Sequence, residues 1–236
     1  MKDIDYHYKQ YVEVYRSTEC FVEWLEKLGY LKKNEIQNIC DMACGGGANI
    51  AYLSSIFENS FFTGIDLADE LVVYGNKQLE GKDKCRLYQG DLYDLDTNWI
   101  GKFHGIISFQ TLSWLPEYEK ALRNLAKLKP DWIAISSLFY EGDIEYIVKV
   151  KDYYRPSGSK EYGEAYYNIY SLSRIKKYFK QLGYSRFSYI PFDIDLDLPK
   201  SESLDLGTYT IKTEDEKRIQ VSGALMMPWY FIVASK

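Results

Sequence analysis

The chain has 236 residues, a length that suits one α/β domain, and 46% of them are hydrophobic, which is enough to form a buried core. Its formal net charge of −5 at pH 7 and the lack of any basic run argue against a nucleic-acid backbone as the main partner. The N-terminal stretch has no apolar signal region, and no run approaches the roughly 20 apolar residues of a membrane span. We therefore expect a cytoplasmic protein with neither membrane nor nucleic-acid partners.

Apolar and aromatic residues recur at helical spacing over 6–29, which predicts an N-terminal helix that ends at Gly29. From residue 36 onward, short apolar runs alternate with helical patterns. The predicted strands are 36–43, 60–67, 85–92, 103–110 and 131–140, and the predicted helices between them are 48–57, 69–80 and 116–129. This alternation indicates crossover units and a parallel sheet, with residues 36–140 as its core.

The residue composition and the periodic pattern of the chain change after residue 140. Residues 140–170 are rich in tyrosine, and the stretch YYRPSG at 153–158 predicts a loop. A Ser-capped helix over 171–184, a strand at 186–194, a hairpin over 207–223 and a last strand at 229–236 are predicted to follow. We interpret 141–170 and 192–226 as insertions near the substrate site of a single domain that spans 1–236, and not as separate domains.

The stretch DMACGGG, residues 41–47, places a glycine-rich turn between the first predicted strand and the first predicted crossover helix. Such a turn lets a ligand approach the backbone closely, and the helix N-terminus favours polar or anionic groups. The dinucleotide fingerprint G-x-G-x-x-G is not matched, because Ile50 occupies its third position when the motif is read from Gly45. This mismatch disfavours a nicotinamide-dependent oxidoreductase. The four cysteines form no C-x-x-C pair and the chain has two histidines, so no metal site is predicted.

Two further acids follow the next two predicted strands. Asp66, in "GIDL", lies at the end of the second predicted strand, about 20 residues after the glycines, where a carboxylate can accept hydrogen bonds from both hydroxyls of a ribose. Asp91, in "GDL", lies at the end of the third, where an acid can accept from an adenine amino group. Because the carboxyl ends of parallel strands line one crevice, these acids and the glycine turn are expected to meet there.

Together these motifs resemble those of the class I S-adenosylmethionine-dependent methyltransferases. The resemblance implies a doubly wound, Rossmann-like sheet of seven mostly parallel strands with an antiparallel last strand, plus the N-terminal helix and a β-hairpin insertion. It also implies that S-adenosylmethionine is the cofactor. The implied cofactor-binding residues are Asp41, Ala43, Gly45, Gly47, Asp66, Leu67, Asp91, Leu92 and Phe109. Two positions depart from the family: Ala43 replaces the usual first glycine, and His104 stands where the fourth strand often begins with an acid.

A small polar acceptor is the expected substrate. The family branch that methylates amines of bases or glutamine amides has Asn/Asp-Pro-Pro-Tyr after the fourth strand, whereas this chain has Ser108-Phe109-Gln110-Thr111. The tail GALMMPWYFIVASK, residues 223–236, resembles methyltransferases that modify sugars and polysaccharides, which favours O-methylation of a sugar or a similar hydroxyl compound. The alternatives are N-methylation of a small amine and a non-catalytic protein that senses the cofactor or acts as a scaffold.

A hydroxyl nucleophile gains from a base that takes its proton, whereas an amine needs none. His7 and Glu141 are the candidate catalytic bases, because histidine ordinarily titrates near neutral pH and Glu141 follows the fifth strand. Tyrosine and tryptophan present an apolar face and a polar tip to an organic ligand. The candidate substrate-binding residues are Tyr11, Tyr15, Trp114, Tyr140 and Tyr170. We expect the N-terminal helix, within residues 1–30, and the tyrosine-rich segment to cover the site as lids; the sequence leaves the oligomeric state open.

Overall fold

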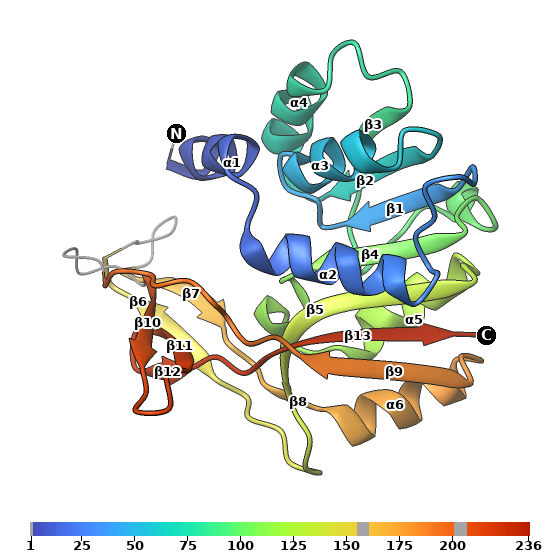
Figure 1. The fold of residues 1–236 in the computed structure, drawn as a ribbon. Helices are drawn as coiled ribbons and strands as arrows, with labels where there is room; N and C mark the ends of the chain where they lie inside the picture. Colours follow the sequence, from blue (N-terminus) through green and yellow to red (C-terminus); the bar gives the residue numbers. More distant parts are fainter. Residues whose placement is uncertain (1, 155–160, 201–206) are drawn as a thin grey trace.

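A central β-sheet runs through the molecule, with helices on both of its faces (Figure 1). In this computed structural model the described residues are 2–154, 161–200 and 207–236. Among them an eight-stranded sheet has the order β3-β2-β1-β4-β5-β13-β9, with β8 paired to β5. The bounds are β1 Asn38–Met42, β2 Phe61–Asp66, β3 Cys85–Gln89, β4 Gly105–Phe109, β5 Trp132–Tyr140, β8 Tyr170–Ser171, β9 Arg186–Pro191 and β13 Trp229–Ser235.

Strands β1 to β5 are parallel, and β13 runs antiparallel to both β5 and β9. This arrangement confirms the predicted Rossmann-like fold with an antiparallel last strand. The two-residue strand β8, which pairs with the end of β5, was not predicted. A strand this short carries no apolar alternation that a sequence pattern could reveal.

Each face of the sheet has its own apolar core, because successive strand residues point to opposite faces. In β4, Ile106 packs on one side with α5 (Glu119–Lys127) and α6 (Leu172–Gln181). The next residue, Ile107, packs on the other side with α2 (Arg16–Lys27), α3 (Ala48–Ile56) and α4 (Asp69–Gln78). Short 3₁₀ turns, η1 (Thr97–Trp99) and η2 (Leu112–Trp114), flank β4 in the chain.

The N-terminal segment forms two helices, which corrects the prediction of one helix over 6–29. Helix α1 (Lys2–Val12) and helix α2 are separated by an extended residue, Tyr15, with φ −66° and ψ 136°. Helix α2 packs Phe21 and Leu25 into the core, whereas α1 lies over α3 (Figure 1). One straight helix could not make both sets of contacts, so tertiary packing overrides the continuous periodicity.

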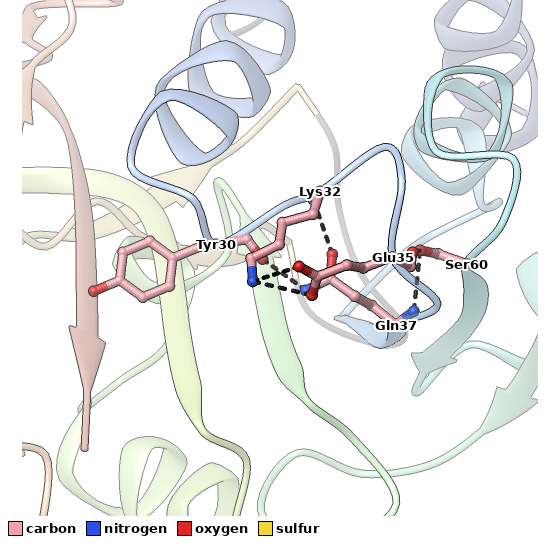
Figure 2. Close-up of polar contacts among 5 residues, drawn as sticks. All are labelled: Tyr30, Lys32, Glu35, Gln37 and Ser60. Atoms are coloured by element: carbon pink, nitrogen blue, oxygen red, sulfur yellow. Dashed lines mark hydrogen bonds and ion pairs between the residues drawn. The ribbon is translucent and has the colours of Figure 1, made fainter.

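A polar network closes the connection between α2 and β1 (Figure 2). The buried amide of Gln37 donates from Nε2 to the carbonyl of Tyr30 at 2.9 Å and accepts from the backbone N–H of Lys32 at 2.9 Å. The backbone N–H of Gln37 donates to Ser60 Oγ at 3.3 Å, and Lys32 Nζ pairs with Glu35 at 2.9 Å. Because the buried amide is satisfied on both sides, this network holds the connection from α2 to β1 in place.

Two local predictions are confirmed. Helix α6 begins after Ser171, whose Oγ accepts from the backbone N–H of Arg174, and Gly183 beyond its C-terminus has φ +94°. His104 is exposed at the start of the fourth strand, as expected. Its Nδ1 accepts from the backbone N–H of Asn38 at 2.9 Å, so it satisfies a donor at the start of β1.

The two insertions form small antiparallel sheets at one end of the central sheet (Figure 1). Strands β6 (Lys149–Asp152) and β7 (Gly163–Tyr166) pair in the first, and the predicted hairpin of β10 (Thr208–Lys212) and β11 (Arg218–Ser222) is confirmed in the second, extended by β12 (Leu225–Met226). A cluster of Leu138, Tyr167, Met227 and Trp229 joins them to the end of β5. The loop predicted at 153–158 lies mostly outside the described residues.

Within the described ranges no helix combines the length and apolarity needed to cross a bilayer. The same residues contain no group of three or more His, Cys, Asp or Glu side chains that could hold a metal ion.

Candidate functional site

A cavity of about 340 Å³ opens at the carboxyl ends of β1, β2 and β4. The chain builds β2 and β3 on one side of β1, then crosses to β4 and β5 on the other. In open α/β sheets such a reversal leaves a crevice in which ligands bind. The cavity volume lies within the range of about 300–1,000 Å³ that is usual for small-molecule sites.

The glycine-rich turn forms the floor of this cavity. Ala43, Gly45 and Gly47 have φ of +60°, +53° and +81°, so the backbone alternates through the left-handed region. Ala43 adopts that region at a cost of about 1–2 kcal/mol, and its N–H donates to the carbonyl of Ile65 at 2.7 Å. Ala43 and Gly45 line the cavity, whereas Gly47 caps α3 and faces Leu87, where a Cβ would meet a methyl carbon at 3.0 Å.

Asp66 at the end of β2 lies in the cavity wall and braces the turn. Its Oδ2 accepts from the N–H of Gly45 at 2.7 Å, and its Oδ1 accepts from the N–H of Ala68 at 2.9 Å. Each carboxylate oxygen can accept a second hydrogen bond. The carboxylate is therefore oriented by the backbone while it keeps acceptor capacity for a ligand.

Asp41, at the end of β1, is 2% exposed, and no described residue donates a hydrogen bond to either of its carboxylate oxygens. Burial raises the pKa of this carboxyl well above its usual value, and the neighbouring charge of Asp66 raises it further. An unpaired buried carboxylate is costly unless a donor or a cation reaches it. The raised pKa favours the protonated carboxyl, and Asp41 is not among the residues that line the cavity.

Helix α1 lies directly on the glycine turn. A Cβ at Gly45 would lie 2.4 Å from Cε1 of His7, so the imidazole packs against the bare Cα of that glycine. Tyr11 Oη donates to the carbonyl of Gly46 at 2.5 Å, and burial raises the pKa of Tyr11 well above its ordinary value. His7 Nδ1 lies 2.9 Å from Oε1 of Gln10, and both side chains line the cavity.

The segment after β4 forms the opposite wall. Phe109, Gln110, Thr111 and Trp114 line the cavity there, and Tyr15 lines it from the start of α2. Trp114 is 36% exposed, and its ring meets Tyr167 edge to face at 4.0 Å between centroids. Aromatic and neutral polar side chains therefore alternate on this side.

The structure brings seven of the predicted residues together around the cavity. They are His7, Tyr15, Ala43, Gly45, Asp66, Phe109 and Trp114. Tyr11 and Asp41 lie next to it, through Gly46 and the glycine turn. The predicted roles of all these residues stay predictions, because they concern ligands.

Other predicted residues lie away from the cavity lining. Leu67 is 66% exposed, and Asp91 Oδ1 accepts from the N–H of Tyr93 at 2.8 Å, which leaves its second oxygen available. Leu92 packs against the core under α5. Glu141 is exposed beside Tyr230, and Tyr140 is 43% exposed with its ring against Tyr146.

Tyr170 needs a correction, because the structure places it in the core instead of at a ligand site. Its side chain is 1% exposed, its Oη donates to the carbonyl of Leu115 at 3.0 Å, and Asn168 Nδ2 donates to it at 2.9 Å. The composition of the 140–170 segment could not distinguish this inward-facing ring from its exposed neighbours. Conversely, Gln10, Thr18, Asn49, Gln110 and Thr111 line the cavity and were not predicted. Their place after β4, at the start of α3 or in the N-terminal helices was the only available signal.

Comparison with solved structures shows the same fold in several proteins. The YcgJ protein from Bacillus subtilis is 12% identical, with 92% of this chain and 98% of that one covered and a TM-score of 0.56. Magnesium protoporphyrin IX methyltransferase (ChlM) from Synechocystis PCC 6803, solved with bound SAH, is 16% identical, with 100% of this chain and 86% of that one covered and a TM-score of 0.53. A SAM-dependent methyltransferase from Aquifex aeolicus is 16% identical, with 89% of this chain and 87% of that one covered and a TM-score of 0.50.

Some of the other matched chains are longer, and this chain spans 62%, 50% and 41% of three of them. No curated protein matches the sequence. Residues 39–131 match a family described as Methyltransferase domain. That segment runs from β1 to the end of the α5–β5 connection and contains the glycine turn, Asp66 and Asp91.

The fold is that of the class I methyltransferases, and residues 39–131 carry the matched methyltransferase domain. The sequence motifs imply S-adenosylmethionine as the cofactor. The residues of the site fit that group. Asp66 keeps acceptor capacity for ribose hydroxyls, and Ala43 and Gly45 of the glycine turn line the cavity beside it.

Proposed function

We propose that the enzyme methylates a hydroxyl group of a small polar metabolite such as a sugar. The observation that carries this proposal is the wall opposite the glycine turn. It combines the rings of Tyr15, Phe109 and Trp114 with neutral polar groups of Gln110 and Thr111. Aromatic faces beside amide and hydroxyl groups suit a polyhydroxylated molecule, and the volume limits it to a small one.

In this proposal each side chain has a defined task. The cofactor supplies a methyl group activated on a sulfonium. Asp66 holds the ribose, and the aromatic wall excludes water from the displacement. His7 takes the proton of the acceptor hydroxyl, since its ring lies in the cavity wall whereas Glu141 does not line it.

The N-terminal helix and the insertions are proposed to cover the substrate. Tyr11 ties α1 to the glycine turn, and Tyr167 from the first insertion touches Trp114 in the cavity wall. Arg16, at the start of α2, pairs with Asp195 of the second insertion at 3.1 Å. Both insertions therefore contact elements that line the cavity.

The experiment is turnover with S-adenosylmethionine and a polar metabolite extract, followed by mass spectrometry of the products. Formation of S-adenosylhomocysteine with a methyl ether on a sugar or polyol supports the proposal. A methylated amine as the product would replace it by N-methylation, for which His7→Ala should leave the rate nearly unchanged. Turnover that requires added protein or nucleic acid in place of the extract would contradict it. The control variant Asp143→Ala alters an exposed acid outside the cavity lining and should keep the wild-type turnover.

A further inference from the structure

Gln110 has an unusual backbone for a residue with a side chain. It follows the last residue of β4, lines the cavity and has φ +56°. Residues with a Cβ adopt this left-handed region at a cost in free energy, and such strained positions are concentrated at functional sites. A residue retained there needs a compensating role.

The side chain of Gln110 is held between two elements of the site. Its backbone N–H donates to the carbonyl of Ser136 on β5 at 2.8 Å, and its Nε2 donates to Oγ of Ser17 on α2 at 2.9 Å. Within the described part of the chain no donor lies within hydrogen-bond distance of its Oε1. The amide is therefore oriented from one end while its oxygen remains able to accept a hydrogen bond.

The charges around this wall restrict what can bind beside it. Among the described lining residues none is Lys or Arg, and Asp66 is the acid of the wall. The nearby cation Arg16 already pairs with Asp195 at 3.1 Å and with Glu19 at 3.3 Å. A carboxylate or phosphate on the reacting end of an acceptor would be desolvated here without a partner of opposite charge.

We infer that Gln110 determines acceptor specificity: its Oε1 accepts a hydrogen bond from the nucleophilic group and orients that group toward the transferred methyl. The acceptor class is then a molecule whose reacting atom carries a hydrogen, a hydroxyl or an amine, and not a carboxylate. This inference rests on the proposed function. It assigns Gln110 a contact with the acceptor, whereas Asp66 and the glycine turn bind the cofactor.

The test uses two cofactor analogues and needs no identified acceptor. Sinefungin carries an amine where the cofactor has its methyl sulfonium, whereas S-adenosylhomocysteine has no donor there. The wild-type protein should bind sinefungin about tenfold more tightly than S-adenosylhomocysteine, because one hydrogen bond from a charged donor is worth about that much. Gln110→Asn and Gln110→Gly both tolerate a left-handed backbone and should bind the two analogues alike, with the affinity for S-adenosylhomocysteine retained. Gln110→Glu keeps the side-chain shape but places a negative charge beside the amine of sinefungin. It should therefore increase the preference for sinefungin over S-adenosylhomocysteine.

Two controls separate this role from a structural one. Gln220→Asn makes the same change on β11, outside the cavity lining, and should keep the wild-type preference. Ser17→Ala removes only the bond that orients the amide, so S-adenosylhomocysteine should bind as before. The inference is overturned if the Gln110 variants keep the preference for sinefungin, or if they lose both analogues together with thermal stability. If the wild-type protein binds neither analogue, the cofactor assignment itself fails and the inference fails with it.

Discussion

Replacing Asp66 by Ala should weaken both cofactor binding and the glycine turn, by amounts that the structure allows us to separate. Its carboxylate accepts from the N–H groups of Gly45 at 2.7 Å and Ala68 at 2.9 Å. Each bond to this half-buried side chain contributes about 1 kcal/mol, so the free energy of unfolding should fall by about 2 kcal/mol. For a chain of this size that loss lowers Tm by about 4–8 °C.

Cofactor affinity should fall further, because the ribose hydroxyls lose a charged acceptor in a partly desolvated site. A hydrogen bond to a charged group contributes about 1.5–3 kcal/mol, which predicts a Kd for S-adenosylhomocysteine that is about 10- to 100-fold higher. Titration calorimetry and thermal unfolding measure the two effects separately. Asp69→Ala, at an exposed acid three residues away, should leave both nearly unchanged. A lower Tm with an unchanged Kd would refute the reasoning and make Asp66 a purely structural brace.

Three further predictions follow from the same site. Gly45→Val should lower the affinity for S-adenosylhomocysteine at least about tenfold, because its Cβ would displace the His7 ring 2.4 Å away. Gly101→Val is the control. It has the same left-handed strain, with φ +73°, but its Cβ would have no atom within 4 Å, so it should keep that affinity. Tyr11→Phe should cost about 1 kcal/mol by removing the donor to Gly46 and should speed hydrogen exchange of α1; unchanged exchange would show that this bond does not hold the helix down. Because the pKa of Asp41 is raised by folding, the native state binds its proton more tightly, and stability should fall as the pH rises above the unfolded-state pKa of about 3.9. Asp41→Asn should therefore raise Tm at pH 8 with an advantage that shrinks toward pH 4, and a pH-independent difference would contradict this sign.

The cofactor side of the site could largely be predicted from local sequence patterns. The glycine turn and Asp66 follow strands whose apolar runs are short and bounded, and both line the cavity. The acceptor side could be predicted only in part. Aromatic residues were the only signal there, and they predicted Trp114 and Tyr15 as lining residues but also Tyr170, which is buried in the core. A ring serves a core and a binding site equally well, so composition alone does not separate the two.

The sequence by itself determined the alternation of strands and helices and the gathering of acids at one edge of the sheet. Periodicity and turn chemistry act over a few residues, and parallel strands present their carboxyl ends on the same side. Only the tertiary structure decided that α1 breaks from α2 and lies over Gly45, and that Gln110 takes a left-handed backbone. Both depend on contacts between distant parts of the chain, Tyr11 with Gly46 across 35 residues and Gln110 with Ser17 across 93. Such contacts override local preference because they bury surface and satisfy polar groups that no short segment can satisfy alone.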